Sequence, residues 1–124
     1  MATILIAEDD PISRRILTFV LSKSGHTVIT ATHGNEALAR LAETPVDLLV
    51  ADINMPEMDG VSLLKHLRAD EIYKKLPVII LTASGQSEDY LIAREAGADE
   101  VLTKPTSSGQ LLEVVDKTLA LRKE

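Results

Sequence analysis

Five short apolar segments recur along the chain and alternate with segments that have helical periodicity. The apolar segments have the length of β-strands and lie at residues 4–7, 27–31, 48–52, 78–81 and 100–103. The segment that follows each of them carries apolar residues at every third or fourth position, which is typical of an amphipathic helix. Five strands that alternate with five helices predict an α/β fold in which helices cover both faces of a parallel sheet.

The composition of the strands predicts their order in the sheet. Residues 4–7, 48–52 and 78–81 are nearly continuous apolar runs, as strands buried on both faces are, whereas residues 27–31 and 100–103 are more polar or shorter. The last two strands are therefore expected at the edges. With strands numbered along the chain, the order 2-1-3-4-5 meets this condition in a doubly wound, three-layer sandwich. Its switch point, where ligands of such sheets bind, lies between strands one and three.

Capping signals and periodicity predict where helices begin and which faces they bury. Asp10 before Pro11 indicates an N-cap, and Ser107 with Gln110 matches the capping box S-x-x-Q. The residues expected on the inner faces of the five helices, in chain order, are Ile12, Ile16, Phe19 and Val20; Ala37, Leu38 and Leu41; Val61, Leu63, Leu64 and Leu67; Leu91, Ile92 and Ala96; and Leu111, Leu112, Val115 and Leu119.

Polar side chains stand where four of the strands end. Glu8 and Asp9 follow the first strand, Asp52 ends the third, Thr82 follows the fourth and Lys104 follows the fifth. Because the carboxyl ends of parallel strands share one edge of the sheet, the three carboxylates are expected to meet there. Their mutual repulsion favours a bound divalent cation at neutral pH. Oxygen ligands with no His or Cys nearby favour Mg²⁺ or Mn²⁺ over zinc.

Asp52 is the candidate nucleophile at this edge. A metal ion, the ammonium group of Lys104 and the hydroxyl of Thr82 around its carboxylate provide what phosphoryl transfer to Asp52 requires, namely a nucleophile and positive charge near the equatorial oxygens. Taken singly, each residue has an ordinary structural explanation, such as turn capping or strand packing. The combination favours a functional site.

The combination also resembles the receiver domain of bacterial two-component response regulators. The matching positions are Glu8–Asp9, Asp52 with Met55–Pro56 and Asp59–Gly60 after it, Thr82–Ala83, and Lys104–Pro105. The resemblance covers essentially the whole chain. It implies a flavodoxin-like (βα)5 fold and a single receiver domain over residues 1–124. It also implies a signalling switch in a phosphorelay, not an enzyme, that catalyses its own phosphorylation and slow dephosphorylation.

This resemblance assigns roles to individual residues. It makes Asp52 the phosphoacceptor, and the implied Mg²⁺ ligands are Glu8, Asp9, Asp52 and the backbone carbonyl of Asn54. Thr82 would bind a phosphoryl oxygen in the active state, and Lys104 would pair with the phosphoryl group. The donor would be a sensor histidine kinase or a phosphotransfer protein, and the signal would pass to a downstream protein or an output domain. The sequence leaves open whether the chain acts alone or belongs to a longer protein.

One position departs from the pattern of many receivers. Val101 stands three residues before the matching lysine, where many members carry Tyr or Phe. A valine side chain cannot move an aromatic surface between exposed and buried states. We therefore expect the signal to travel through the segment from Thr82 to Ser87 and the start of the fourth helix.

Charge and composition exclude several other classes of protein. The net charge of −6, from 19 acidic and 13 basic residues, argues against binding to nucleic acid or an anionic membrane. The chain has no cysteine, which excludes disulfides and thiol chemistry. No apolar run approaches the roughly 18 residues of a membrane span, and Met1–Thr3 lacks a basic signal-peptide region. A cytoplasmic protein is therefore expected.

Three alternative functions remain open from the sequence. An FMN-binding, flavodoxin-like domain would share the architecture, but it needs a hydroxyl- and glycine-rich phosphate loop where this chain has Glu8 and Asp9. An aspartyl-phosphate phosphatase of the haloacid dehalogenase type would need a second aspartate two residues after the nucleophile, and Asn54 occupies that position. A purely structural interaction domain would leave the combination of five polar positions unexplained.

Overall fold

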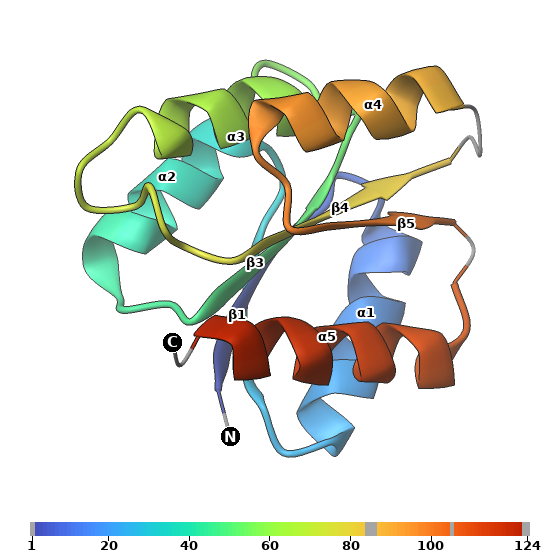
Figure 1. The fold of residues 1–124 in the computed structure, drawn as a ribbon. Helices are drawn as coiled ribbons and strands as arrows, with labels where there is room; N and C mark the ends of the chain where they lie inside the picture. Colours follow the sequence, from blue (N-terminus) through green and yellow to red (C-terminus); the bar gives the residue numbers. More distant parts are fainter. Residues whose placement is uncertain (1, 84–86, 105, 123–124) are drawn as a thin grey trace.

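Five parallel strands and five helices alternate strictly in the part of the chain that the computed structural model describes, residues 2–83, 87–104 and 106–122 (Figure 1). The strands are β1 Thr3–Ala7, β2 Thr27–Ala31, β3 Leu48–Asp52, β4 Val78–Thr82 and β5 Glu100–Thr103. The helices are α1 Pro11–Lys23, α2 Gly34–Glu43, α3 Gly60–Arg68, α4 Ser87–Ala96 and α5 Ser108–Arg122. The strands pair in the order β2-β1-β3-β4-β5, which confirms the predicted fold class and strand order.

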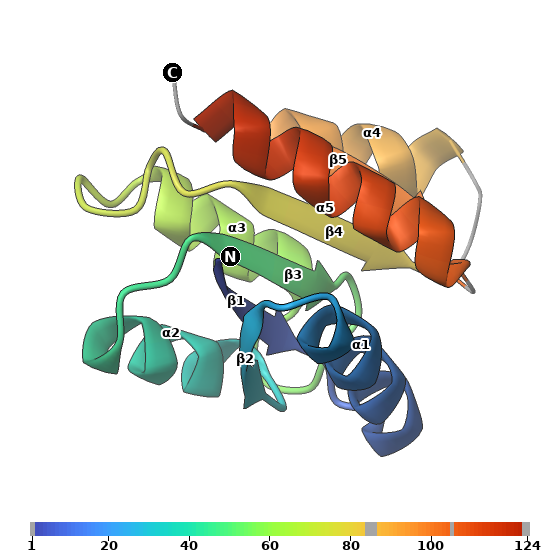
Figure 2. The same ribbon diagram turned by 90° about the horizontal axis from the view of Figure 1, so that it is seen from below.

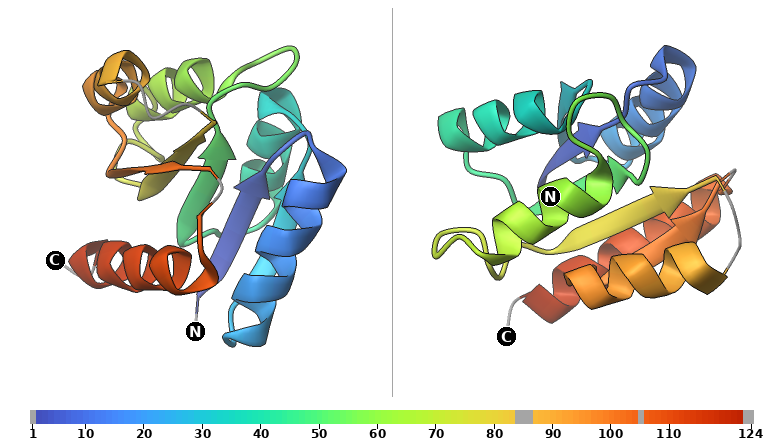
Figure 3. Two further views of the ribbon diagram at one scale, coloured as in Figure 1. Left: turned by 90° about the vertical axis from the view of Figure 1, so that its right-hand side faces the viewer. Right: turned by 90° about the horizontal axis from the view of Figure 1, so that it is seen from above.

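The sheet is the middle layer between two helical layers. Helices α2, α3 and α4 lie on one face, and α1 and α5 lie on the other, as the views from below, from the side and from above show (Figures 2 and 3). Strands β3 and β4 are buried along their whole length, while β2 is mostly half-buried or exposed. The sheet therefore has apolar central strands and more polar edges, as the composition predicts.

Each helical layer packs on one face of the sheet and buries a separate cluster of apolar side chains. On the face of α2, α3 and α4, the fully or nearly buried helix residues are Ala37, Leu41, Leu63, Leu64, Leu67 and Ala93. On the face of α1 and α5 they are Leu17, Leu21, Leu111 and Val115. Aromatic residues make up only 2% of the chain, and the core is built almost entirely from aliphatic side chains.

The predicted caps hold the helix starts in place. The Asp10 carboxylate accepts a hydrogen bond from the amide of Ser13 at 2.9 Å, and Pro11 occupies the first turn of α1. At the start of α5, the Ser107 hydroxyl accepts from the amide of Gln110 at 3.1 Å, as the capping box predicts. The Gln110 side chain instead accepts a hydrogen bond from the hydroxyl of Thr106 at 3.2 Å.

The predicted buried face of α1 is wrong except for Val20, which is partly buried against the core. Ile12, Ile16 and Phe19 are 68, 57 and 64% exposed, and the buried residues of this helix are Leu17 and Leu21. The helix carries two apolar stripes, and periodicity alone does not say which of them meets the sheet. The exposed residues Ile12, Ile16 and Phe19 are called the α1 stripe below.

The predicted buried face of α4 is also wrong for its two larger residues, Leu91 and Ile92. Leu91 and Ile92 are exposed, Ala96 is partly buried, and the fully buried residue is Ala93. A small side chain on the inner face lets this helix lie close to α3 and to the sheet, with which it makes its contacts. Leucine and isoleucine are more hydrophobic than alanine, and the sequence pattern therefore favoured Leu91 and Ile92 over Ala93 as the buried residues.

Candidate functional site

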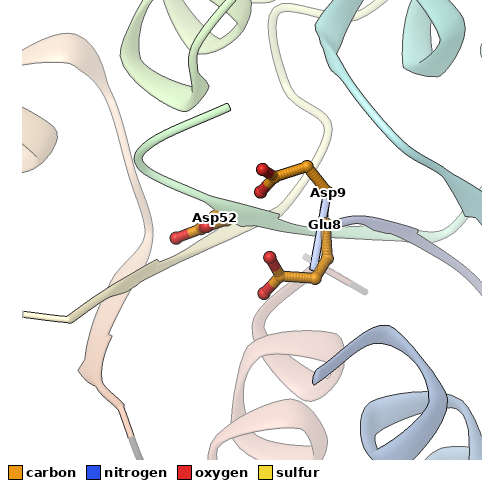
Figure 4. A group of neighbouring side chains, drawn as sticks. All are labelled: Glu8, Asp9 and Asp52. Carbon is orange, nitrogen blue, oxygen red and sulfur yellow. The ribbon is translucent and has the colours of Figure 1, made fainter. Parts of the chain in front are cut away.

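The acidic cluster lies where the switch point of the sheet predicts it. Ala7 of β1 pairs with Ala51 of β3, so the next residues, Glu8 and Asp52, leave the sheet side by side. One carboxylate oxygen from each of Glu8, Asp9 and Asp52 lies within 4.8 Å of the others. Figure 4 shows the three carboxylates pointing in the same direction from the ends of the two strands.

The three acidic side chains differ in their access to water. Glu8 is fully buried, Asp52 is 7% exposed, and Asp9 lies at the surface. The cluster therefore forms an acidic site at the edge of the sheet, with Glu8 in its interior and Asp9 at its surface. Asp52 is slightly open to the outside, whereas Glu8 is covered by the surrounding protein.

Lys104 supplies the positive charge of the site. Its Nζ atom lies 2.8 Å from Oε1 of Glu8 and 3.5 Å from Oδ2 of Asp52. Burial by itself would lower the pKa of Lys104, but the hydrogen bond to Glu8 and the charges of Asp52 and Glu8 outweigh it, so the pKa is raised. Lys104 therefore stays protonated between two carboxylates at neutral pH.

Burial of Glu8 favours the uncharged form of its carboxyl group. Loss of water raises the pKa of the Glu8 carboxyl, and the nearby charge of Asp52 raises it further. Hydrogen bonds from Lys104 and from the amide of Asp10 offset part of this effect. A bound cation would also offset the cost of burying this charge, because it adds positive charge beside a carboxylate that water does not reach.

Arg14 holds the loop that carries the acidic pair. Its guanidinium donates hydrogen bonds to the backbone carbonyls of Glu8, at 2.9 Å, and Asp9, at 3.4 Å. This role of Arg14 is not identified in the sequence analysis above. The available signal is position, because a residue one turn into α1 can reach back to the end of β1. Arg15 is exposed, in contrast to Arg14.

Two glycines let the loop after β3 pack closely over the site. A Cβ on Gly60 would lie 2.3 Å from the carbonyl oxygen of Asp52, and one on Gly34 would lie 2.7 Å from Met58. The amides of Gly60 and Gly34 donate to the carbonyls of Ile53 and Met58. The Asp59–Gly60 pair therefore does two things: Asp59 caps α3 through the amide of Ser62, and Gly60 lets the helix begin against the end of β3.

Thr82 lies at the end of β4 and is 2% exposed. Its hydroxyl donates to Oδ2 of Asp89, in the first turn of α4, at 3.4 Å. Its carbonyl accepts from the amide of Lys104 at 2.6 Å, which joins the ends of β4 and β5. The residues at 84–86 and Pro105 lie outside the described part of the chain.

The donor set fits Mg²⁺. Two oxygens bound to one Mg²⁺ lie at most about 4.2 Å apart, given metal–oxygen distances of about 2.1 Å. Oxygens within 4.8 Å of one another therefore need only a small side-chain rotation to share one ion. All three donors are carboxylates, which magnesium prefers, and Asn54, two residues after Asp52 in the chain, is exposed.

A groove lies beside Lys104 and Ile16. It has a volume of about 520 Å³ and is lined by Ser13, Ile16, Leu17, Leu81, Ala83, Lys104 and Thr106. Ile16 belongs both to this groove and to the exposed stripe, and Lys104 belongs both to the groove and to the acidic site. One residue of the α1 stripe therefore lines the same groove as the lysine of the acidic site.

Comparison with known proteins identifies the family. The model of the response regulator receiver domain matches residues 4–116, and the chain belongs to this family. Receiver domains are the signalling switches of two-component systems. The predicted family is thus confirmed, and the flavodoxin and dehalogenase alternatives lose their support.

Two curated relatives illustrate the range of proteins in which such chains occur. Chemotaxis protein CheY1 of Helicobacter pylori is 36% identical over 118 residues, which make up 94% of this chain and 95% of that protein. Transcriptional regulatory protein GlrR of Escherichia coli K12 is also 36% identical over 118 residues, but this chain spans only 26% of its length. Similar sequences therefore occur both as whole proteins and as parts of longer ones.

Solved structures agree with this assignment. A response regulator from Chloroflexus aurantiacus superposes with a TM-score of 0.93 at 35% identity and covers 96% of this chain and 98% of its own. The receiver domain of sensor histidine kinase PA1611 from Pseudomonas aeruginosa has a TM-score of 0.89 at 26% identity, covers 96% of this chain and 98% of its own, and is described with a magnesium ion in its active-site cleft. In our chain, no helix of the described residues has the length and apolar character needed to cross a membrane.

Proposed function

We propose that this domain accepts a phosphoryl group on Asp52, with Mg²⁺ bound, and switches the binding of a protein partner. The observation that carries the proposal is the position of Lys104, whose ammonium group lies between Glu8 and Asp52 in a cluster of three carboxylates. A structural ion pair needs one carboxylate. A third carboxylate, that of Asp9, is exposed at the rim and adds negative charge, which a bound cation would offset.

The reaction follows from these positions. A carboxylate oxygen of Asp52 attacks the phosphorus of the donor, and the bond from phosphorus to the donor nitrogen or oxygen breaks as the new bond forms. Mg²⁺, held by Glu8, Asp9, Asp52 and the carbonyl of Asn54, would supply positive charge to the phosphoryl oxygens. Lys104 contributes a second positive charge, and the Thr82 hydroxyl donates to a phosphoryl oxygen after transfer.

The proposed donor is a histidine kinase or a histidine phosphotransfer protein, and we propose that it docks on the α1 stripe. This stripe is apolar and exposed, and Ile16 within it lines the groove at Lys104. Phe19→Ser should slow transfer from a phosphohistidine donor and leave labelling by acetyl phosphate unchanged. Ile72→Ser is the control, because Ile72 is 80% exposed outside the stripe. Equal effects of the two variants would reject this docking site.

The phosphoacceptor assignment has a direct test. Incubation with acetyl phosphate and Mg²⁺ should add one phosphoryl group, as intact-mass measurement detects, and Asp52→Asn should abolish the addition. Asp10→Asn is the matched control, since Asp10 is a nearby acid that caps α1, and it should be labelled normally. Undiminished labelling of Asp52→Asn would reject the assignment. The extent of the domain over residues 1–124, the downstream partner and the cytoplasmic location stay predictions.

A further inference from the structure

Asp89 makes a contact with the site that the functions assigned so far do not use. Its Oδ2 accepts a hydrogen bond from the Thr82 hydroxyl at 3.4 Å. Thr82 is 2% exposed, whereas Asp89 is half-buried in the first turn of α4. The contact joins the phosphoryl-binding hydroxyl of the proposed mechanism to a helix outside the acidic cluster.

The backbone around Thr82 is fixed on both sides. The amide of Ile53 donates to the carbonyl of Leu81 at 2.8 Å, and the amide of Lys104 donates to the carbonyl of Thr82 at 2.6 Å. Strand β4 is also paired with β3 and β5 along its length. Rotation about χ1 is therefore the simplest way to redirect the hydroxyl. For a β-branched residue this rotation moves the oxygen from one staggered position to another.

The hydroxyl has a single proton to donate. Oδ2 of Asp89, at 3.4 Å, is an acceptor for that proton in the structure, and a phosphoryl group on Asp52 would offer a competing, more highly charged acceptor. Both acceptors cannot receive the same hydrogen bond at full strength. The contact with Asp89 therefore stabilises the state in which Thr82 does not bind a phosphoryl group.

We propose that Asp89 is a positioning residue that holds the Thr82 hydroxyl in the unphosphorylated state. Phosphorylation of Asp52 transfers this hydrogen bond from Asp89 to a phosphoryl oxygen and frees the first turn of α4 from the end of β4. The inference rests on the proposed function of Asp52. It gives the signal a route into α4 that needs no aromatic residue on β5, where the half-buried Val101 packs against the core.

Asp89 also has an ordinary structural role, which the experiment has to separate. An acidic residue in the first turn of a helix is stabilised by the helix dipole. Glu88 shares this role, because it lies in the same turn with the same charge. Glu88 is exposed and hence provides a matched control for charge and helix stability.

The test measures the affinity for beryllofluoride, a phosphoryl mimic, with Mg²⁺ present, by NMR titration of the amides. Loss of a partly exposed hydrogen bond that opposes binding should tighten the affinity of Asp89→Ala by about two- to fivefold. Glu88→Ala should bind as the wild type does. Thr82→Val keeps the shape of the side chain and removes the hydroxyl, so adding Asp89→Ala to Thr82→Val should change nothing further.

Two results would overturn the inference. One is an equal effect of Asp89→Ala and Glu88→Ala, which would assign the effect to charge or helix stability. The other is an effect of Asp89→Ala that persists in the Thr82→Val background. Failure of the wild type to bind beryllofluoride through Asp52, tested with Asp52→Asn, would instead reject the proposed function and the inference that rests on it.

Discussion

Lys104 and Glu8, which are 96 residues apart in the chain, form a 2.8 Å ion pair in which the carboxylate is fully buried. The pair joins the end of β5, at one edge of the sheet, to the end of β1 near its centre. It holds a positive charge 3.5 Å from Oδ2 of Asp52. The ion pair therefore contributes both to the charge of the site and to the free energy of unfolding. Substitution of Lys104 tests both contributions.

Lys104→Met should destabilise the protein when Mg²⁺ is absent, because it leaves the buried Glu8 carboxylate without its partner. Removing one member of a buried pair costs about 3–5 kcal/mol, and since the Lys104 side chain is 22% exposed we expect a smaller loss of about 1–3 kcal/mol. Urea denaturation measures the loss. The control Lys74→Met removes an exposed pair with Glu71 and should change the unfolding free energy by no more than about 1 kcal/mol.

The loss in Lys104→Met should also depend on pH. The pKa of Glu8 is raised in the folded protein, so its contribution favours folding below its unfolded pKa and is lost as pH rises through the folded value. Without Lys104 this loss grows, because the charged form of Glu8 is left unpaired. The variant should therefore be closest to the wild type in acid and furthest from it at neutral pH. A constant difference across this range would show that Glu8 is not the affected group.

Mg²⁺ should raise the stability of the wild type. Binding only to the folded state stabilises it by RT ln(1 + [L]/Kd), about 2.7 kcal/mol at 100 times Kd. Asp9→Asn should remove most of this effect, because it takes away one of three clustered carboxylates. Asp10→Asn should keep it, since the Asp10 side chain caps α1. Thermal unfolding with and without Mg²⁺ measures the stabilisation of each variant. If Mg²⁺ raises the melting temperature of Asp9→Asn as much as that of the wild type, the ion binds elsewhere.

Gly60→Ala should destabilise the protein and slow the labelling of Asp52. A Cβ only 2.3 Å from the Asp52 carbonyl oxygen forces α3 or the end of β3 to move, at a cost of about 1–3 kcal/mol. Gly109→Ala is the matched control, because nothing lies within 4 Å of its Cβ position in α5. It should stabilise the protein by about 0.4–1 kcal/mol. Urea denaturation ranks the two variants, and a neutral Gly60→Ala would refute the close approach.

The sequence predicted the sheet and the location of the site because both depend on simple patterns. Continuous apolar strands are buried on both faces, so the composition of β1, β3 and β4 determines their central position. The strand order then brings Glu8 and Asp52 together, since both follow directly on paired residues. No knowledge of side-chain packing is needed for either step.

The sequence did not predict which face of a helix is buried where the helix carries two similar stripes of apolar residues. On α1, Leu17 and Leu21 repeat at the same spacing as Ile12 and Ile16, and only contact with the sheet selects the first pair. Arg14 was missed for a related reason. An arginine next to another arginine looks solvated, and its hydrogen bonds to two carbonyls depend on how α1 turns back toward β1. Asp89 likewise lies seven residues from Thr82, with no periodic signal that links the two.

The cap of α1 should give a pH dependence of opposite sign to that of Glu8. The amide of Ser13, through its hydrogen bond to the carboxylate, holds the pKa of Asp10 below its usual value. A carboxyl whose folded pKa is depressed contributes stability above its unfolded pKa, and this contribution is lost as pH falls through the folded value. Asp10→Asn and Asp10→Ser keep a capping side chain without a charge. Each should be less stable than the wild type at pH 7, and the difference should shrink below about pH 4. Denaturation at several pH values measures this, and a difference that persists undiminished in acid would show that the charge of Asp10 does not stabilise α1.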